Sequence, residues 1–193
     1  MRWINPLVPV FAVALVAATA PSADAQSERS WLLELQGGAF VPLSPSTWTQ
    51  AVKTSVGIGA AVGYQLAPRV YLIASGTWGL VTGKEEAAPD WDVFGYFISG
   101  AYDLTEGKSV SLLAQLGAGG STYELNASGG ESKTYFAVNG GMKALWHINP
   151  KVGLSLNAHA RASFAKKEDF GSTETGTEII WNLPLTAGVF FRF

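Results

Sequence analysis

Residues 152–164 read VGLSLNAHARASF, and this stretch decides the fold. Apolar residues fill every second position from Val152 to Phe164, and small or polar residues fill the positions between them. Side chains of a β-strand point alternately to two faces, whereas a helix would spread both sets around its circumference. The stretch therefore predicts a long strand with one apolar face and one polar face.

The same alternation occurs in residues 179–193 and, less regularly, in six other segments. These are residues 30–40, 55–66, 70–81, 93–104, 109–121 and 133–147. A strand in a water-soluble protein usually has about 5–6 residues, and a tilted strand needs about 9–11 to cross the hydrocarbon of a membrane. All eight segments reach that longer length, which favours strands that span a membrane.

The predicted connections alternate between short and long. The short ones cover residues 67–69, 105–108 and 148–151, and the long ones cover 41–54, 82–92, 122–132 and 165–178. Transmembrane barrels have short turns at one end and longer loops at the other. Pro184 lies inside the last predicted strand and lacks a backbone N–H donor, so we expect a bulge or a local break there.

Composition agrees with a chain whose exterior is not water. The 193 residues include 15% charged and 48% hydrophobic residues, with a net charge of −2 and no cysteine. The balance of charge offers no basic surface for nucleic acid, and the absence of cysteine excludes disulfides and thiolate chemistry.

These features together define the fold class that we expect. Unpaired backbone groups in hydrocarbon would each cost several kcal/mol, so the sheet must close on itself. We predict an all-β fold, an eight-stranded antiparallel up-and-down transmembrane β-barrel. The alternative is a soluble barrel of the lipocalin or streptavidin kind, which needs an apolar interior and a polar exterior. It would bury Asn157, His159 and Arg161 around a ligand and expose Leu154 and Leu156 to water. The unbroken apolar face disfavours it.

The first 25 residues have the pattern of a secretory signal peptide. Arg2 provides the positive charge, residues 7–20 form a short apolar stretch, and Ala23-Asp24-Ala25 is a small-x-small cleavage site before Gln26. The apolar stretch is shorter than the roughly 20 residues of a membrane anchor, which is the alternative. We therefore expect a signal peptide over 1–25 and a barrel domain over 26–193.

Aromatic residues fall near both ends of the predicted strands. Amphipathic rings collect at the two interfaces of a bilayer, although aromatic residues are also frequent in strands generally. One group lies near the short turns and comprises Trp31, Tyr64, Tyr102, Trp146 and Phe191, and the other lies toward the long loops and comprises Trp78, Phe94, Tyr96, Phe136 and Trp181.

The end of the chain carries a family resemblance. Val189, Phe191 and the terminal Phe193 alternate in a way that resembles the C-terminal assembly signal of bacterial outer-membrane barrels. With eight strands, the chain resembles the small outer-membrane β-barrel family, which includes the opacity proteins and the barrel of outer membrane protein A. The resemblance implies a monomer in a Gram-negative outer membrane, with membrane lipids and the barrel-assembly machinery as partners. We expect no peptidoglycan-binding domain after Phe193.

The predicted lumen contains several ionisable side chains. Glu34, Lys143 and Arg192 all lie low on their strands, toward the short turns, so we expect Glu34 to pair with Lys143, Arg192 or both, because unpaired buried charges are costly. His159 and Arg161 lie higher, with Glu124 or loop acids as candidate partners. Such pairs can act as a gate that exchanges partners, or as a fixed network that fills the lumen. We favour the fixed network.

We expect no catalytic residue, metal or cofactor. A lipid A deacylase of this size uses a His with a Ser two residues later, on the lipid face, whereas His159 faces the predicted lumen and is followed at that spacing by Arg161. The sequence therefore favours a structural role or surface contacts through the long loops, where Trp48 and Trp91 are candidate binding aromatics. A narrow or gated pore is the main alternative, and a lipid-modifying enzyme is disfavoured.

Overall fold

The computed structural model describes residues 30–84, 90–105, 109–126, 130–170 and 175–193. The predicted signal peptide and the loop acids Glu85 and Glu86 lie outside these residues. The elements are β1 (Trp31–Ser44), α2 (Ser46–Ala51), β2 (Ser55–Ala67), β3 (Val70–Val81), β4 (Asp90–Asp103), β5 (Val110–Asn126), β6 (Ser132–His147), β7 (Val152–Lys166), the 3-10 helix η1 (Lys167–Phe170) and β8 (Thr177–Arg192).

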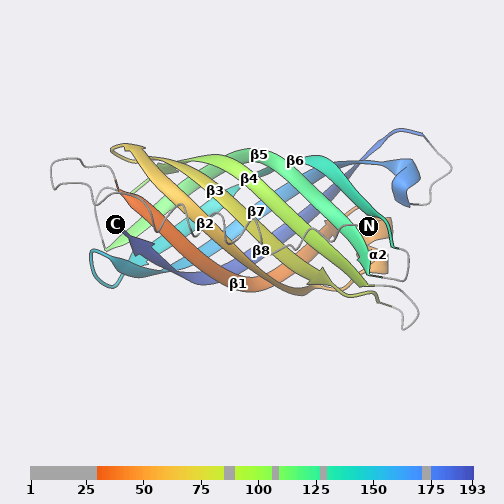
Figure 1. The fold of residues 1–193 in the computed structure, drawn as a ribbon, viewed down its shortest axis with the longest axis horizontal. Helices are drawn as coiled ribbons and strands as arrows, with labels where there is room; N and C mark the ends of the chain where they lie inside the picture. Colours follow the sequence, from red (N-terminus) through yellow and green to blue (C-terminus); the bar gives the residue numbers. More distant parts are fainter. Residues whose placement is uncertain (1–29, 85–89, 106–108, 127–129, 171–174) are drawn as a thin grey trace.

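The eight strands form a closed antiparallel barrel in chain order, as predicted (Figure 1). The seam is the pairing of β1 with β8, which runs from Leu32↔Arg192 to Ser44↔Trp181. Closure leaves no sheet edge to be satisfied by solvent. No helix among the described residues is long and apolar enough to cross a membrane.

The side chains of β7 confirm which face of the sheet looks outward. Leu154 and Leu156 are 43% and 64% exposed, whereas Ser155 and Asn157 between them are 2% and 5% exposed. The large apolar residues therefore cover the outside, and polar groups point to the barrel axis. This arrangement is the reverse of a soluble lipocalin-like barrel and requires an apolar solvent around the exterior.

Aromatic side chains occupy both ends of that exterior. At the end with the short turns, Trp31 is paired with Tyr64 across β1 and β2, and their ring centroids are 4.7 Å apart. Toward the opposite end, where the long connections lie, Phe136 stacks on Phe164 at 5.9 Å. Two aromatic belts are typical of a barrel that spans a bilayer.

Several strands extend beyond their predicted ends. β1 continues to Ser44 and β5 continues to Asn126, while β4 begins at Asp90. The pairing Asp90↔Asn126 shows that the hairpin of β4 and β5 carries its hydrogen bonds past the apolar stretch. The residues in this part are mostly polar, so apolar and polar residues do not alternate there. The sequence pattern therefore predicted a loop where the backbone pairing continues.

The first long connection also contains a helix that the sequence did not predict. α2 lies at the same end of the barrel as η1 and opposite the C-terminus (Figure 1). Its Trp48 is 5% exposed and donates a hydrogen bond from Nε1 to Asn182 Oδ1 at 3.1 Å. The expectation that Trp48 is an exposed loop aromatic is therefore wrong. Trp91, the second candidate, lies in β4, and its ring packs edge-on to that of Trp48.

Pro184 produces a local break without a bulge of its own. The pairing of β7 with β8 is interrupted between Ala158↔Leu185 and Arg161↔Asn182, and the register is the same on both sides. On the other side, Pro184 stays paired with Phe40, and the register of β1 shifts between Pro42 and Ser44. The missing N–H donor thus weakens one ladder only.

The lumen is filled in layers. Near the long connections, an apolar mouth cluster contains Phe40, Trp48, Val52, Val81, Val93, Tyr123, Tyr135, Ala165 and Ile180. Near the short turns, an apolar base cluster contains Leu32, Ala61, Tyr71, Ile73, Ala101, Leu113, Leu145 and Phe190. Buried polar residues lie between these clusters, so the polar part of the lumen is closed at both ends.

Candidate functional site

Glu34 is the centre of a buried polar layer in the lumen. Its side chain is fully buried, and its Oε2 accepts a hydrogen bond from the ammonium group of Lys143, which is 2% exposed. Its Oε1 accepts hydrogen bonds from Ser155 Oγ at 2.6 Å and from Asn157 Nδ2 at 2.8 Å. The carboxylate is therefore paired and hydrogen-bonded, as a buried charge requires.

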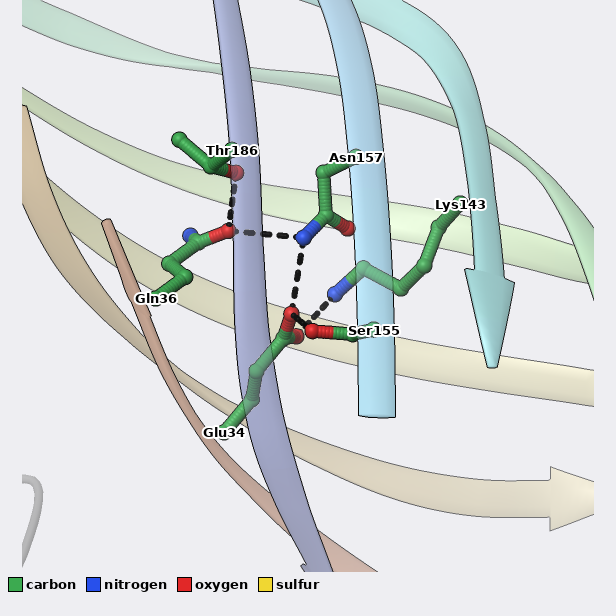
Figure 2. Close-up of polar contacts among 6 residues, drawn as sticks. All are labelled: Glu34, Gln36, Lys143, Ser155, Asn157 and Thr186. Carbon is green, nitrogen blue, oxygen red and sulfur yellow. Dashed lines mark hydrogen bonds and ion pairs between the residues drawn. The ribbon is translucent and has the colours of Figure 1, made fainter. Parts of the chain in front are cut away.

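Neutral side chains extend this layer toward the seam. Asn157 Nδ2 and Thr186 Oγ1 both donate to Gln36 Oε1, at 2.8 and 2.6 Å. Figure 2 shows the six side chains converging from β1, β6, β7 and β8. We call this set the polar layer, and it comprises Glu34, Gln36, Lys143, Ser155, Asn157 and Thr186. It crosslinks the strands that close the barrel.

Arg192 does not join Glu34, although the sequence allowed that pairing. It is paired in register with Leu32 rather than Glu34, so it lies closer to the short turns, and its Nη2 is 3.5 Å from Tyr71 Oη. The sequence left open whether Lys143, Arg192 or both would pair with Glu34. Among the described residues, Lys143 is the only charged group that contacts its carboxylate.

His159 and Arg161 lie in the lumen, and Glu124, one of the acids proposed for them, does not join them. Glu124 is exposed on the opposite face of β5 from the buried Tyr123, so it does not reach Arg161. Arg161 Nη2 instead donates to Thr77 Oγ1 at 2.7 Å. His159 and Arg161 both line a small lumen cavity.

The residues that the sequence did not single out are neutral. Ser155, Asn157, Gln36 and Thr186 complete the polar layer, and Thr77 holds Arg161. The sequence signal that could have identified these residues is their position on the inward-facing side of each strand. Which of them touch one another depends on how neighbouring strands are aligned, which the sequence pattern does not specify.

The residues of the proposed assembly signal lie on the exterior. Val189, Phe191 and Phe193 are 38%, 37% and 67% exposed, and they share the outward phase of the last strand. Phe193 exchanges two backbone hydrogen bonds with Trp31, its N–H to Trp31 O at 3.0 Å and Trp31 N–H to its own O at 3.1 Å. The end of the chain is thus held at the barrel seam.

Comparison with solved structures identifies the class of protein. The fold is similar to that of Neisserial surface protein A, with a TM-score of 0.60, 15% identity, and coverage of 86% of this chain and 98% of that one. It is similar to a major outer membrane protein from Thermus thermophilus, with a TM-score of 0.56, 12% identity, and coverage of 86% and 100%. It is also similar to the N-terminal barrel of Pseudomonas aeruginosa OprF, with a TM-score of 0.54, 13% identity, and coverage of 85% and 97%.

The chain therefore has the fold of the small outer-membrane β-barrels, as the sequence resemblance implied. The shared fold and the apolar exterior indicate a location in a bacterial outer membrane. No family model matches the sequence, and no curated protein matches it. The likeness is one of architecture, so function must be argued from the residues of this chain.

Proposed function

We propose that this protein is a non-enzymatic outer-membrane barrel with a structural role in the cell envelope and surface contacts through its long connections. The observation that supports this proposal is the filled lumen. A polar layer held together by side-chain hydrogen bonds lies between two apolar clusters of buried side chains. A lumen of this kind is a packed core rather than an aqueous path.

The long-connection end supports the surface-contact part of the proposal. Its connections carry charges of both signs next to partly buried aromatic side chains. The last connection contains η1, and its Asp169 contacts two residues of β6. Lys133 Nζ is 3.3 Å from Asp169 Oδ1, and Tyr135 Oη donates to Asp169 Oδ2 at 3.0 Å. These contacts hold η1 against β6 and give the surface a fixed shape.

Among proteins of this fold, one is named for a contact role. The attachment invasion locus protein of Yersinia pestis, Ail, has a TM-score of 0.51 and 15% identity to this chain, with coverage of 86% of this chain and 98% of that one. Its name makes attachment a reasonable function to test here, and it specifies no ligand for this chain.

The test compares cells that lack the protein with cells that carry it or a loop variant. In the variant, a two-residue turn replaces residues 167–176. We expect loss of the protein to increase sensitivity to detergent and to reduce binding to host-derived surfaces. The full chain restores both properties, and the loop variant restores only detergent resistance. Full recovery of binding by the loop variant would exclude contacts through this connection. Unchanged detergent sensitivity on deletion would exclude the structural role.

A further inference from the structure

Arg161 is a buried cation that the polar layer does not neutralise. It projects from β7 into the lumen, is 3% exposed, and lies with its Cζ 4.8 Å from the centre of the Phe97 ring. Its guanidinium packs on β4 at Gly95, where a Cβ would lie 2.5 Å from Arg161 Cζ. Glycine at this position therefore leaves room for the guanidinium.

The charge of Arg161 has no acidic partner among the described residues. Glu34, the fully buried acid of the lumen, is occupied by Lys143. An arginine side chain stays protonated in proteins, and an isolated buried charge is costly. Among the described residues, Arg161 therefore leaves one positive charge in the lumen uncompensated.

Two of the donors of Arg161 are also without acceptors. Nη2 donates to Thr77, whereas Nε and Nη1 are buried and have no hydrogen-bond partner. A buried donor without an acceptor costs about 1–3 kcal/mol, and more when it is charged. Arg161 therefore lacks a hydrogen-bond acceptor that also carries a negative charge.

Arg161 lines a cavity of about 30 Å³. Its lining includes Gln36, Thr77, Gln115, Asn139, His159 and Arg161. A bound water needs about 10–15 Å³ of such space, so the cavity holds about two water-sized particles. Gln115 Oε1 and His159 Nε2 are buried there without partners as well.

We propose that this cavity binds one small monovalent anion of chloride size, together with a water molecule. The anion accepts a hydrogen bond from one of the two unpartnered Arg161 nitrogens, Nε or Nη1, and neutralises the charge of the side chain. These two nitrogens donate from different edges of the planar guanidinium, so the water molecule accepts from the other one. The water donates to Gln115 Oε1, which as an acceptor would repel a directly adjacent anion. His159 Nε2 donates to either particle in the neutral tautomer that carries its proton there. The volume excludes anions such as phosphate with its hydration shell, or gluconate.

The direct test is to refold the barrel in sodium bromide, so that the ion is present while the lumen closes, and to crystallise it. Bromide gives an anomalous signal that water does not. We expect an anomalous peak within hydrogen-bond distance of Arg161 Nε or Nη1. Density without an anomalous signal at this position would mean that water alone fills the cavity, and would overturn the proposal. Bromide found only on the outer surface, an adventitious ion only, would overturn it equally.

A solution test uses the Arg161→Gln variant, with Arg192→Gln as the matched control at the other lumen arginine. Thermal unfolding is followed at constant ionic strength while chloride replaces gluconate. Each protein is refolded separately at every chloride concentration, so that the ion is present while the lumen closes. We expect a saturable rise of about 3 °C or more for the wild type and Arg192→Gln, and none for Arg161→Gln. An equal rise in all three proteins would contradict the site. If Arg161→Gln does not fold, the bromide experiment on the wild type decides.

Discussion

At the residue scale, the stability of the barrel depends on how buried charges are compensated. Glu34 illustrates this, because its carboxylate receives one charged donor from β6 and two neutral donors from β7. A buried ion pair adds little stability over a well-packed apolar pair, but loss of one partner leaves the other charge uncompensated. The Glu34–Lys143 pair therefore fastens strands together only while both members are present.

The Glu34→Gln variant tests this. We expect a loss of about 3–5 kcal/mol in the free energy of unfolding, because Lys143 remains buried and charged. Adding Lys143→Met should recover most of that loss, since the double variant contains no unpaired charge. Urea unfolding of the refolded barrel in detergent or vesicles measures both quantities. A double variant less stable than Glu34→Gln would show that Lys143 is stabilised by contacts other than Glu34.

At the element scale, the short helix α2 changes the end of the barrel that carries the long connections. It brings Trp48 into the mouth cluster, edge-on to Tyr123 at 5.6 Å and to Trp91 at 6.0 Å between ring centroids. The helix has no side-chain cap and is only six residues long. Such a short helix is not stable by itself. The packing of Trp48 holds it in place, together with the hydrogen bond from Lys84 Nζ to Thr49 O and the backbone pairing of Val52 with Gly83.

Truncation of Trp48 should therefore release α2. We expect Trp48→Ala to lower the free energy of unfolding by about 3–5 kcal/mol. Trp48→Phe keeps one aromatic ring but loses the hydrogen bond to Asn182 and part of the buried indole volume, so it should cost less, about 2 kcal/mol. Thermal unfolding measures both variants. Equal effects of the two substitutions would mean that the hydrogen bond, rather than packing, holds the helix.

The connection after β7 depends on a carboxylate outside the membrane. Partial burial acts to raise the pKa of Asp169, but hydrogen bonds from Tyr135 and Lys133 outweigh it, and the pKa lies below the ordinary value. Because the pKa of Asp169 is lower in the folded state, this contact stabilises the loop at pH values above the ordinary pKa of a carboxyl group. The stabilisation is lost as the pH falls through the lowered pKa.

Asp169→Asn should mimic that loss at neutral pH. We expect faster hydrogen exchange in residues 167–170 of the variant, because Lys133 loses its charged partner on η1. The neighbouring Glu168→Gln is the control and should exchange like the wild type. In the wild type, exchange corrected for intrinsic rates should stay constant down to about pH 4 and increase below it. Increased exchange already at pH 6 would refute the assignment to Asp169.

At the scale of the whole molecule, the two ends of the lumen are closed by different means. The base cluster closes the end with the short turns, and the mouth cluster closes the other with help from α2. The polar layer lies between them. Opening a path for ions would require all three layers to move, which distinguishes this barrel from a pore with a single gate.

The purified barrel should therefore not conduct. In planar bilayers we expect no discrete current steps from wild type or from Trp48→Ala, because the polar layer and base cluster remain in place in the variant. Altered gel migration without boiling would verify that the inserted protein is folded, and a known porin would verify the bilayer. Reproducible steps from the folded wild type would support the alternative function as a narrow pore.

The sequence by itself determined the number of long strands, the face of each that meets lipid, and the height of the inward charges. Strand alternation has a period of two, so the apolar phase identifies one face without knowledge of any neighbour. The same reasoning placed Glu34, Lys143, Arg161 and Arg192 in the lumen. It also misjudged the polar ends of β4 and β5, because pairing there continues without an apolar face.

Only the tertiary structure decided which of those groups meet. Lys143 reaches Glu34 and Arg192 does not, while Arg161 packs on Gly95 and Thr77 rather than on an acid. These contacts cross the lumen, and they depend on the cumulative register of all eight strands around the closed sheet. A shift of one residue in any pairing would change every partner. Register is a property of strand pairs, so no single segment of the sequence contains it.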